Sequence, residues 1–447
     1  MRVTELQLQN LKCFADTTFS FSHKKSETYP WVTLLGENGV GKSTVLQALA
    51  LLLAGPEAAK ELMPRPTGWV RDESQPGRLT VKLRQDAADS GTFGDKVQRK
   101  AFTVSYQITG SQPLTIAIGE KSQTYTEPVL LEKPDRPLSW LRTQAFASGS
   151  QGWFAAGYGA FRRLTRVSQV IVPSLDAPKR SSNFFTQFQE DTALSAFERW
   201  MVYLDYRLAK DENDAEAQRM KTVGERAIVK LLPGDVQIAG VTRTGQIEFA
   251  LGGQRVSTIG LSDGFRSIIA LAGDLIWRLL QAFPDLDDPT QAPGVVLIDE
   301  LDIHLHPTWQ REIAGWLRQG FPNLQFLVAT HSPLIAAGAG ADALTLHLAQ
   351  TDGQVDIVEI PYIHLAGTVE RTLTSPAFGL ESTYTPATAR KIQRYHELRR
   401  GRPLQGDDKK EYQHLEVFMR EIQPYGDLSS PDSLENRIDA FLTAHLP

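Results

Sequence analysis

Residues 36–43 read Gly-Glu-Asn-Gly-Val-Gly-Lys-Ser, the G-x-x-x-x-G-K-[ST] pattern of a phosphate-binding loop. The stretch before it, 31–35, is short, apolar and β-branched, and 44–53 reads as a helix that Gly55-Pro56 ends. Strand, loop and helix in this order turn backbone N–H groups and the positive end of a helix dipole toward phosphate oxygens. The sequence therefore predicts a nucleotide site.

Each residue type in this loop predicts a different role in nucleotide binding. Gly36, Gly39 and Gly41 allow the backbone to turn its N–H groups inward. Lys42 would bridge the β- and γ-phosphates, and Ser43 would place its hydroxyl on Mg²⁺. A glycine turn before a buried helix is the simpler alternative, but average residue usage makes the whole pattern rare by chance. The predicted nucleotide contacts are Gly36, Glu37, Asn38, Gly39, Val40, Gly41, Lys42, Ser43 and Thr44.

Far downstream, Leu261-Ser262-Asp263-Gly264-Phe265 has the LSxGx form. This motif is expected to act on another copy of the chain, where it would cap the phosphates held by that copy. We therefore predict that Leu261, Ser262, Asp263 and Gly264 contact the nucleotide of a partner subunit. A chain with one phosphate loop and one such motif would be half of a composite ATPase site.

A third motif, Gly294–Glu300, is a continuous apolar run that ends in two carboxylates. A fully buried parallel strand has this composition, and its C-terminal end is where a ligand is expected. Asp299 is predicted to hold the water shell of Mg²⁺, and Glu300 to polarise the water that attacks the γ-phosphate. Many buried strands end in an acid, so this motif alone is weak evidence. It becomes strong evidence because a phosphate loop and an LSxGx motif come before it.

A further predicted strand, 324–329, leads into Thr330-His331-Ser332-Pro333. A neutral imidazole at this point can hydrogen-bond the γ-phosphate or the attacking water. A lone histidine at the end of a strand is more often structural, but its place as the fourth motif in order favours a catalytic role for His331 beside Glu300. His304 and His306 predict no zinc site, because an i, i+2 pair lacks further ligands and no cysteine is near.

At this point the chain resembles the ABC-type ATPases of the SMC and RecF kind, which include compact defence and repair ATPases described as AAA-family proteins. Leu11-Lys12-Cys13-Phe14 is similar to the opening strand of that group, with a leucine in place of the first aromatic residue, and 157–162 is similar to its YGxxR segment. The resemblance implies an α/β fold, a two-lobe nucleotide-binding head, with ATP and Mg²⁺ as cofactors. It also implies a nucleotide-binding role for Arg162.

Within this group the resemblance leans toward the PtuA-like ATPases of Septu and retron-associated antiviral systems, and AriA-like ATPases of PARIS are a close competitor. Three features favour this subgroup: the short segment between the lobes, the stretch 369–380 and the polar helical tail. It implies an ATPase that controls a separately encoded effector, typically a nuclease. The alternative is a RecF-like DNA-repair ATPase that clamps duplex DNA, with an affinity that falls steeply with salt. A transporter ATPase is disfavoured by the long tail.

Patterning predicts four parts along the chain. They are lobe I at 1–175 with a β-rich insertion at about 56–150, a helical insertion at 176–235, lobe II at 236–362 and a helical C-terminal region at 363–447. The helical insertion is too short for the long arm of an SMC or zinc-hook ATPase. The last part shows neither the glycine-flanked glutamate nor the Asp-x-Asp of a TOPRIM nuclease, so we predict no nuclease activity of its own.

Composition sets broad limits. The chain has 447 residues, of which 41% are hydrophobic and 22% charged, as in ordinary globular proteins. One cysteine, Cys13, excludes a disulfide framework within one chain, and we expect a cytoplasmic protein without a signal peptide or membrane span. The net charge of −5 argues against wholesale coating of nucleic acid. Basic runs at 162–166 and 390–402 leave local contacts with nucleic acid or an effector open.

Overall fold

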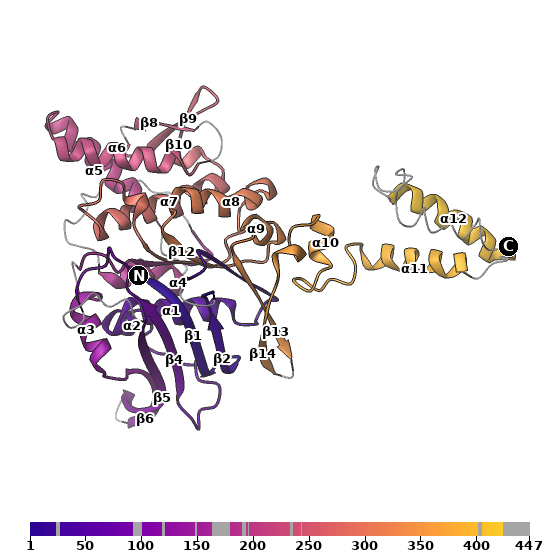
Figure 1. The fold of residues 1–447 in the computed structure, drawn as a ribbon, viewed down its shortest axis with the longest axis horizontal. Coiled ribbons are helices and arrows are strands. Elements are labelled where there is room, and N and C mark those ends of the chain that lie inside the picture. The colour runs from indigo at the N-terminus through magenta and orange to yellow at the C-terminus, as the bar shows by residue number, and fades with distance from the viewer. Residues whose placement is uncertain are drawn as a thin grey trace. The chain divides into compact units, whose positions relative to one another are not determined.

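The computed structural model describes residues 1–23, 27–92, 101–118, 121–147, 150–162, 179–189, 194, 196–232, 236–242, 244–351, 353–400 and 405–422. The chain divides into two compact units, Met1–Phe378 and Gly379–Pro447 (Figure 1). The first unit holds three sheets and the helices α1 to α10, and the second holds α11 and α12. No helix in these described ranges is long and apolar enough to cross a membrane.

The central sheet of the first unit has six strands in the order β14-β13-β3-β12-β11-β7. Every neighbouring pair is parallel except β13 with β14. The carboxyl ends of β3, β12, β11 and β7 therefore meet at one edge, where parallel sheets bind ligands. The strands are β3 (Trp31–Gly36), β7 (Ala155–Tyr158), β11 (Gly294–Ile298), β12 (Leu324–Ala329), β13 (Leu344–Thr351) and β14 (Gln354–Glu359).

Alternate residues of the central strands face two different hydrophobic cores. Val295 and Leu297 of β11 join one core, whereas Val296 and Ile298 join the other. This follows from the two-residue period of a strand and explains why β11 is apolar throughout. Helix α1 (Lys42–Ala54) packs in the first core, and α7 (Asp263–Ala282) and α8 (Pro307–Gly320) pack in the second. The two sets of helices thus cover opposite faces of the sheet.

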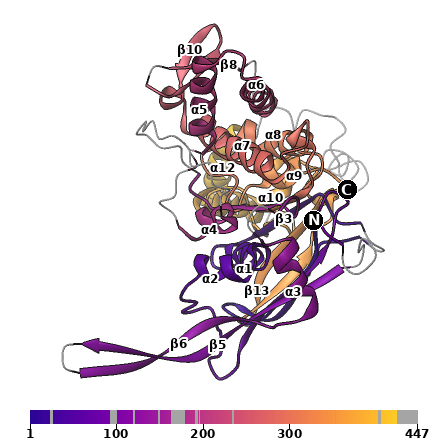
Figure 2. The ribbon, with the colours of Figure 1, turned by 90° about the vertical axis from the view of Figure 1, so that its left-hand side faces the viewer.

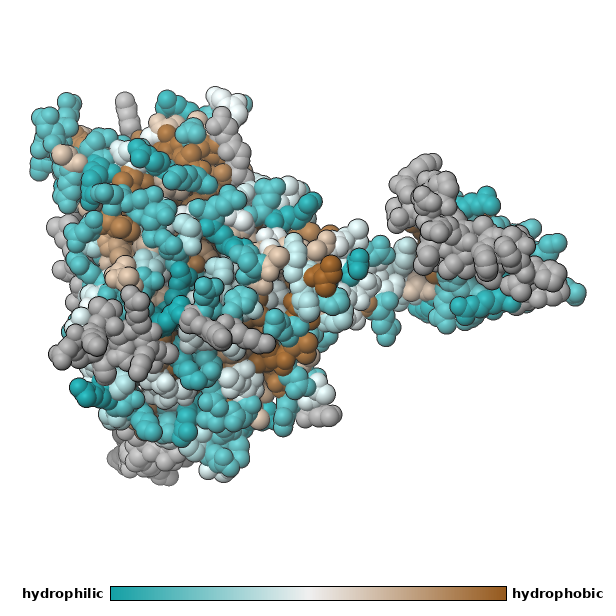
Figure 3. Space-filling model, in the orientation of Figure 1, coloured by the Kyte–Doolittle hydropathy of each residue, from teal (hydrophilic) through white to brown (hydrophobic). Residues whose placement is uncertain are grey.

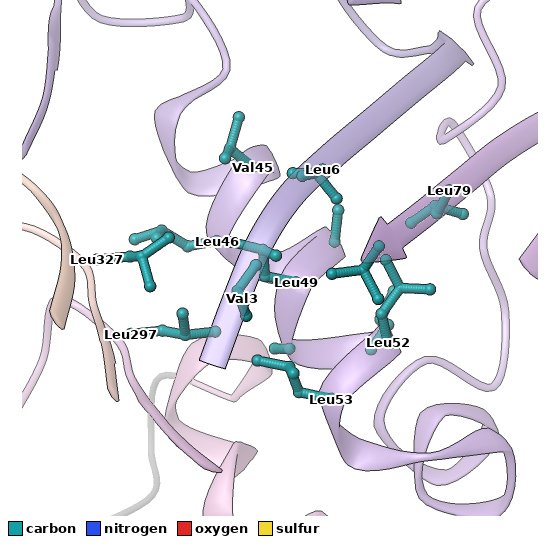
Figure 4. Close-up of a cluster of buried hydrophobic side chains, with 14 of the residues drawn as sticks. Val3, Leu6, Val45, Leu46, Leu49, Leu52, Leu53, Leu79, Leu297 and Leu327 are labelled. Atoms are coloured by element: carbon teal, nitrogen blue, oxygen red, sulfur yellow. The ribbon is translucent and has the colours of Figure 1, made fainter. Parts of the chain in front are cut away.

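Helix α1 is apolar around most of its circumference because it lies between two sheets. Figure 4 shows its side chains among Val3, Leu6 and Leu79 of the second sheet and Leu297 and Leu327 of the central one. That second sheet is antiparallel, in the order β2-β1-β4-β5-β6. A leucine-to-alanine change in such a core typically costs about 2–5 kcal/mol, so the helix behind the phosphate loop is firmly held. The strands are β1 (Arg2–Leu11), β2 (Phe14–Ser20), β4 (Gly77–Arg84), β5 (Ala101–Ile118) and β6 (Lys121–Glu132).

The second core is extended by two helices and a small sheet, which Figure 2 places at the end of the unit opposite the long β5–β6 hairpin. These are α5 (Ala196–Lys210) and α6 (Ala215–Val229) with β8 (Gln237–Val241), β9 (Ile247–Leu251) and β10 (Gln254–Ser257). The remaining short elements are α2 (Pro56–Leu62), α3 (Arg136–Gln144), α4 (Phe185–Phe188), α9 (Pro333–Gly338), α10 (Val369–Leu373), η1 (Arg180–Asn183), η2 (Thr258–Gly260), η3 (Pro289–Gln291) and η4 (Tyr362–His364).

The second unit is a helical hairpin of α11 (Pro386–Arg400) and α12 (Gly406–Ile422). The rings of Tyr395 and Tyr412 stack with centroids 5.2 Å apart, and Arg394 pairs with acids of α12. Two of its described hydrophobic side chains are buried, those of Leu398 and Leu415. The predicted α/β fold with β-rich and helical insertions and a helical C-terminal region is confirmed. The four domain boundaries drawn from the sequence stay predictions.

Candidate nucleotide site

The phosphate loop joins β3 to α1, and its three glycines have positive φ: 144° at Gly36, 84° at Gly39 and 97° at Gly41. Two of them also lie against other chain segments. A Cβ on Gly41 would lie 2.6 Å from the Sγ of Cys13, and one on Gly36 would lie 2.4 Å from the carbonyl oxygen of Leu348. Only glycine meets both demands, since other residues rarely adopt positive φ.

Lys42 folds back over its own loop. Its Nζ donates hydrogen bonds to the carbonyl oxygens of Gly36 at 2.9 Å and Glu37 at 2.8 Å, and the residue is buried. Burial lowers the pKa of Lys42, and the negative charges of the acids at 299–302 act in the opposite direction. The ammonium group therefore lies between the phosphate loop and the predicted catalytic acids.

Asp299 follows directly after β11, at the ligand edge of the sheet. Its Oδ1 is buried and has no hydrogen-bond partner among the described atoms. Burial raises the pKa of this carboxyl, and a hydrogen bond from the Ser43 hydroxyl acts in the opposite direction, followed by the charges of Arg162 and Lys42. A serine hydroxyl beside a carboxylate with a free oxygen suits Mg²⁺, a cation that prefers oxygen ligands. Within the described ranges no group of three or more His, Cys, Asp or Glu side chains could hold a metal.

Arg162 is fully buried behind these acids. Its Nη1 donates to the carbonyl oxygens of Gly159 at 2.8 Å and Asp299 at 2.7 Å, and its Nη2 donates to that of Glu300 at 2.9 Å. Burial lowers the pKa of Arg162 to about 10, against the charges of the neighbouring acids. The nucleotide contact predicted for Arg162 stays a prediction, because the hydrogen bonds described for it end on backbone carbonyls. Its geometry is that of a positioning residue.

The segment that carries His331 follows β12, between the phosphate-loop strand and β11. Asp302 accepts hydrogen bonds on its Oδ1 from the Thr330 hydroxyl at 2.5 Å and from the His331 backbone N–H at 3.3 Å. Ser332 then caps α9 and donates to Gln310 at 2.7 Å. The sequence analysis did not single out Asp302, although a third carboxylate only three residues after Asp299 was a visible signal.

The LSxGx motif begins helix α7. The side chain of Ser262 is exposed and does not cap its own helix, and Asp263 is exposed beside Arg266. Gly264 is buried, and a Cβ there would lie 2.8 Å from the carbonyl oxygen of His304. The structure brings Lys42, Ser43, Asp299 and Glu300 together. The LSxGx motif lies apart from them on α7, which covers the face of the central sheet opposite α1.

A buried polar network connects α7 to the strand before Arg162, and the sequence analysis missed it. The Tyr158 hydroxyl donates to Oδ2 of Asp274 at 2.9 Å, and Nε of Arg278 donates to the same oxygen at 2.5 Å. Arg278 also donates to Asn183 at 2.5 Å. Burial, together with the charge of Asp274, raises the pKa of Tyr158 well above its ordinary value.

The predicted site residues all lie within the part of the chain that matches a protein-family model. A family model described as "AAA domain, putative AbiEii toxin, Type IV TA system" matches residues 32–337. The chain belongs to this family. The match extends from β3 into α9 and so includes the phosphate loop, the LSxGx motif, both acids and His331.

Three relatives extend the comparison. The chain is 25% identical to the Septu protein PtuA of Bacillus mycoides (strain KBAB4) over 99% of this chain and 54% of that protein, so it spans about half of that relative. It is 23% identical to the retron Vc95 probable ATPase of Vibrio cholerae serotype O1 biovar El Tor, over 75% of this chain and 71% of that one. It is 26% identical to the retron Ec83 probable ATPase of Escherichia coli, over 75% and 69%. The predicted resemblance to PtuA-like and retron ATPases is confirmed.

Among solved structures, an SMC head bound to the C-winged helix domain of ScpA aligns with a TM-score of 0.48 and 14% identity, over 81% of this chain and 98% of that one.

Proposed function

We propose that this protein hydrolyses ATP to ADP and phosphate at sites shared between two copies of the chain, and thereby controls a separately encoded nuclease in antiviral defence. The observation that carries the proposal is the arrangement of Lys42, Ser43 and the unpartnered Oδ1 of Asp299 at the ligand edge of the central sheet. The printed names of the retron relatives support hydrolysis of ATP.

Binding would begin at the phosphate loop. The backbone N–H groups between Gly36 and Gly41 and the N-terminus of α1 would receive the phosphate oxygens. Lys42 would exchange its two backbone carbonyl acceptors for β- and γ-phosphate oxygens, which an ammonium group binds more strongly because they are charged. Ser43 and Asp299 would hold Mg²⁺, which supplies positive charge to the phosphates as they react.

Hydrolysis would then depend on Glu300 and His331. Glu300 follows Asp299 and would orient and polarise the attacking water. Arg162 would position Glu300 by fixing the backbone on both sides of it. His331 would contact the γ-phosphate or the water. Asp302 would hold the backbone of His331 in place beside the acids.

The second half of each site would come from a partner copy. Ser262 is exposed and leaves the first N–H groups of α7 uncapped by its side chain, so the helix presents donors and the positive end of its dipole to an approaching γ-phosphate. Because α7 lies on the face of the sheet opposite α1, a second chain is the natural source of these donors. Two chains would enclose two nucleotides.

Subunit mixing tests the proposal directly. Lys42→Ala should lose ATP binding, and Ser262→Arg should bind ATP but not hydrolyse it. Their heterodimer has one intact composite site, so mixing the two inactive proteins should restore about a quarter of wild-type hydrolysis if exchange is random and the sites are independent. Normal hydrolysis by Ser262→Arg alone would contradict a shared site.

Control of an effector is the part of the proposal that rests on the relatives, one of which is named a Septu protein. The experiment is co-purification of the chain with the product of the neighbouring open reading frame, followed by a nuclease assay with and without ATP. Direct clamping of DNA is the competing outcome. It would appear as duplex binding that weakens by orders of magnitude as salt rises, because each neutralised phosphate releases counterions.

A further inference from the structure

A second hollow of the first unit lies outside the nucleotide site. It is a pocket of about 430 Å³ between α8, α9 and the segment 362–372, and none of the predicted site residues lines it. Leu334 and Ala337 of α9 line one side, and Leu365 and Val369 line the other. Thr368, Thr372 and Arg311 line it beside these apolar residues, and a hollow that combines apolar walls with polar groups can hold a ligand with both kinds of chemistry.

Three exposed apolar residues lie at this pocket: Tyr362 and Val369 line it, and Ile363 follows Tyr362 in the chain. Tyr362 is 36% exposed, Ile363 67% and Val369 46%. Figure 3 shows a small hydrophobic group at the surface near α9 and α10, among pale and hydrophilic neighbours. Single exposed apolar residues are ordinary, but a group of them around a hollow marks an interaction surface.

One charge stands among these apolar groups. Arg311 of α8 lines the pocket and is exposed, and it makes neither an ion pair nor a side-chain hydrogen bond with the described part of the chain. A guanidinium group with free donors is suited to a carboxylate, which it can bind through two parallel hydrogen bonds. The pocket therefore offers room for an apolar side chain and a charge partner for an acid beside it.

The floor of the pocket is connected to the nucleotide site. Leu365 belongs to a small buried cluster with Ala336 of α9 and Leu35, the residue before the phosphate loop. Helix α9 itself begins directly after His331 and Ser332. It also packs closely on α8, because a Cβ on Gly338 would lie 2.2 Å from the carbonyl oxygen of Arg311. A ligand in the pocket would thus contact α9, the helix that follows β12 after the segment with His331.

We propose that this pocket is the docking site for an acidic and apolar peptide segment of a partner protein. An apolar side chain of that segment enters between Leu334 and Val369, and a neighbouring Asp or Glu pairs with Arg311. The identity of the partner as the controlled effector rests on the proposed function, whereas the pocket and its chemistry do not. Binding here and hydrolysis of ATP are therefore separable by experiment.

The test is a selection of short random peptides on the full-length chain without nucleotide. We expect the selected peptides to carry Asp or Glu next to Leu, Ile or Phe. Arg311→Glu should weaken their binding by about tenfold or more, because it replaces an attractive charge with a repulsive one. Ala366→Trp, which fills the exposed lip of the pocket, should weaken it as well.

Arg226→Glu is the matched control, since Arg226 is an exposed arginine on α6, which does not line the pocket. It should leave peptide binding unchanged, and all three variants should bind ATP like the wild type. The proposal is overturned if no peptide is enriched, if the selected peptides are basic, or if Arg311→Glu binds them as well as the wild type does. Failure of the subunit-mixing experiment would leave these outcomes unaffected.

Discussion

Glu300 has an unusual backbone for a residue that is not glycine. Its φ is 45°, in the left-handed region, where a side chain is strained by about 1–3 kcal/mol. The neighbouring carbonyl groups are fixed by the buried guanidinium of Arg162. Strain of this kind persists only where surrounding contacts determine the geometry, so Arg162 is a reason why the acid points where it does.

Replacing Arg162 by Lys should separate positioning from binding. An ammonium group cannot reproduce the planar fork that reaches three carbonyl oxygens. We expect ATP affinity to change little, whereas turnover should fall by about 10²-fold, because a shift of about 1 Å in a catalytic group has an effect of that size. Isothermal titration and steady-state hydrolysis measure the two quantities.

Arg180 provides a matched control for this substitution. Arg180 is only partly buried, but burial likewise lowers its pKa to about 10, and it donates to the carbonyl oxygens of Leu53, Ala145 and Trp153, away from the acids. Arg180→Lys should lower the free energy of unfolding without lowering turnover of the folded protein. If both variants lose turnover equally, Arg162 has no specific part in catalysis.

Glu300→Gln should bind ATP and hydrolyse it very slowly. The amide keeps the shape of the side chain but loses the charge that polarises water, and a positioned general base contributes about 10²-fold or more. Single-turnover hydrolysis measures this effect. Turnover within about threefold of the wild type would exclude Glu300 as the base, since that is far below the usual contribution.

Residue types at fixed spacing allowed the loop glycines, Lys42, Ser43 and the two acids to be predicted, because their chemistry depends on neighbours along the chain. The hydrogen bonds of Asp302 and the positioning contacts of Arg162 were not predictable in that way. Arg162 reaches Glu300 across 138 positions, and Asp302 reaches Thr330 across 28. Contacts at such separations arise from the sheet order, which local patterns do not encode.

At the scale of elements, the end of strand β7 links the helix of the LSxGx motif to the predicted catalytic acids. It ties to α7 through Tyr158 and Asp274, and Arg162, four residues further on, ties to the turn after β11. If a nucleotide held by a partner copy, as proposed, displaces α7, the displacement would reach the predicted catalytic acids through the segment 158–162. Short apolar runs predicted the strands β3, β11 and β12 of the same sheet, but the pairing of β7 with β11 joins residues 140 positions apart.

Tyr158→Phe should weaken this connection. It leaves Asp274 with one buried hydrogen bond fewer, which lowers the free energy of unfolding by about 1–3 kcal/mol. We also expect slower hydrolysis at unchanged ATP affinity, which a purely structural role would not produce. Urea unfolding and turnover at saturating ATP check the two effects.

Tyr106→Phe is the control for that experiment. Tyr106 is equally buried, but its hydroxyl has no hydrogen-bond partner among the described atoms. Removing an unsatisfied hydroxyl should be neutral or slightly stabilising. Equal losses of stability in the two variants would show that the Tyr158 hydrogen bond is not the relevant feature.

At the scale of the whole molecule, the separation of α1 and α7 on opposite faces of the central sheet predicts that ATP brings two chains together. The only cysteine of the chain is Cys13, so Cys13→Ser gives a background in which added cysteines can be crosslinked selectively. Asn38 is exposed in the phosphate loop, and Ile259 is 45% exposed just before the LSxGx motif. These two positions lie on surfaces that should face each other only across two subunits.

With Asn38→Cys, Ile259→Cys and Glu300→Gln combined in that background, a short bis-maleimide should produce a covalent dimer in the presence of ATP and Mg²⁺. Removal of the cation by EDTA should abolish the product, because Ser43 and Asp299 would then lose the ion that links them to the phosphates. Adding Lys42→Ala should have the same effect, and neither single-cysteine protein should crosslink in this way. A dimer band that forms equally without ATP, or in the Lys42→Ala protein, would show that the two surfaces meet for a reason other than a shared nucleotide.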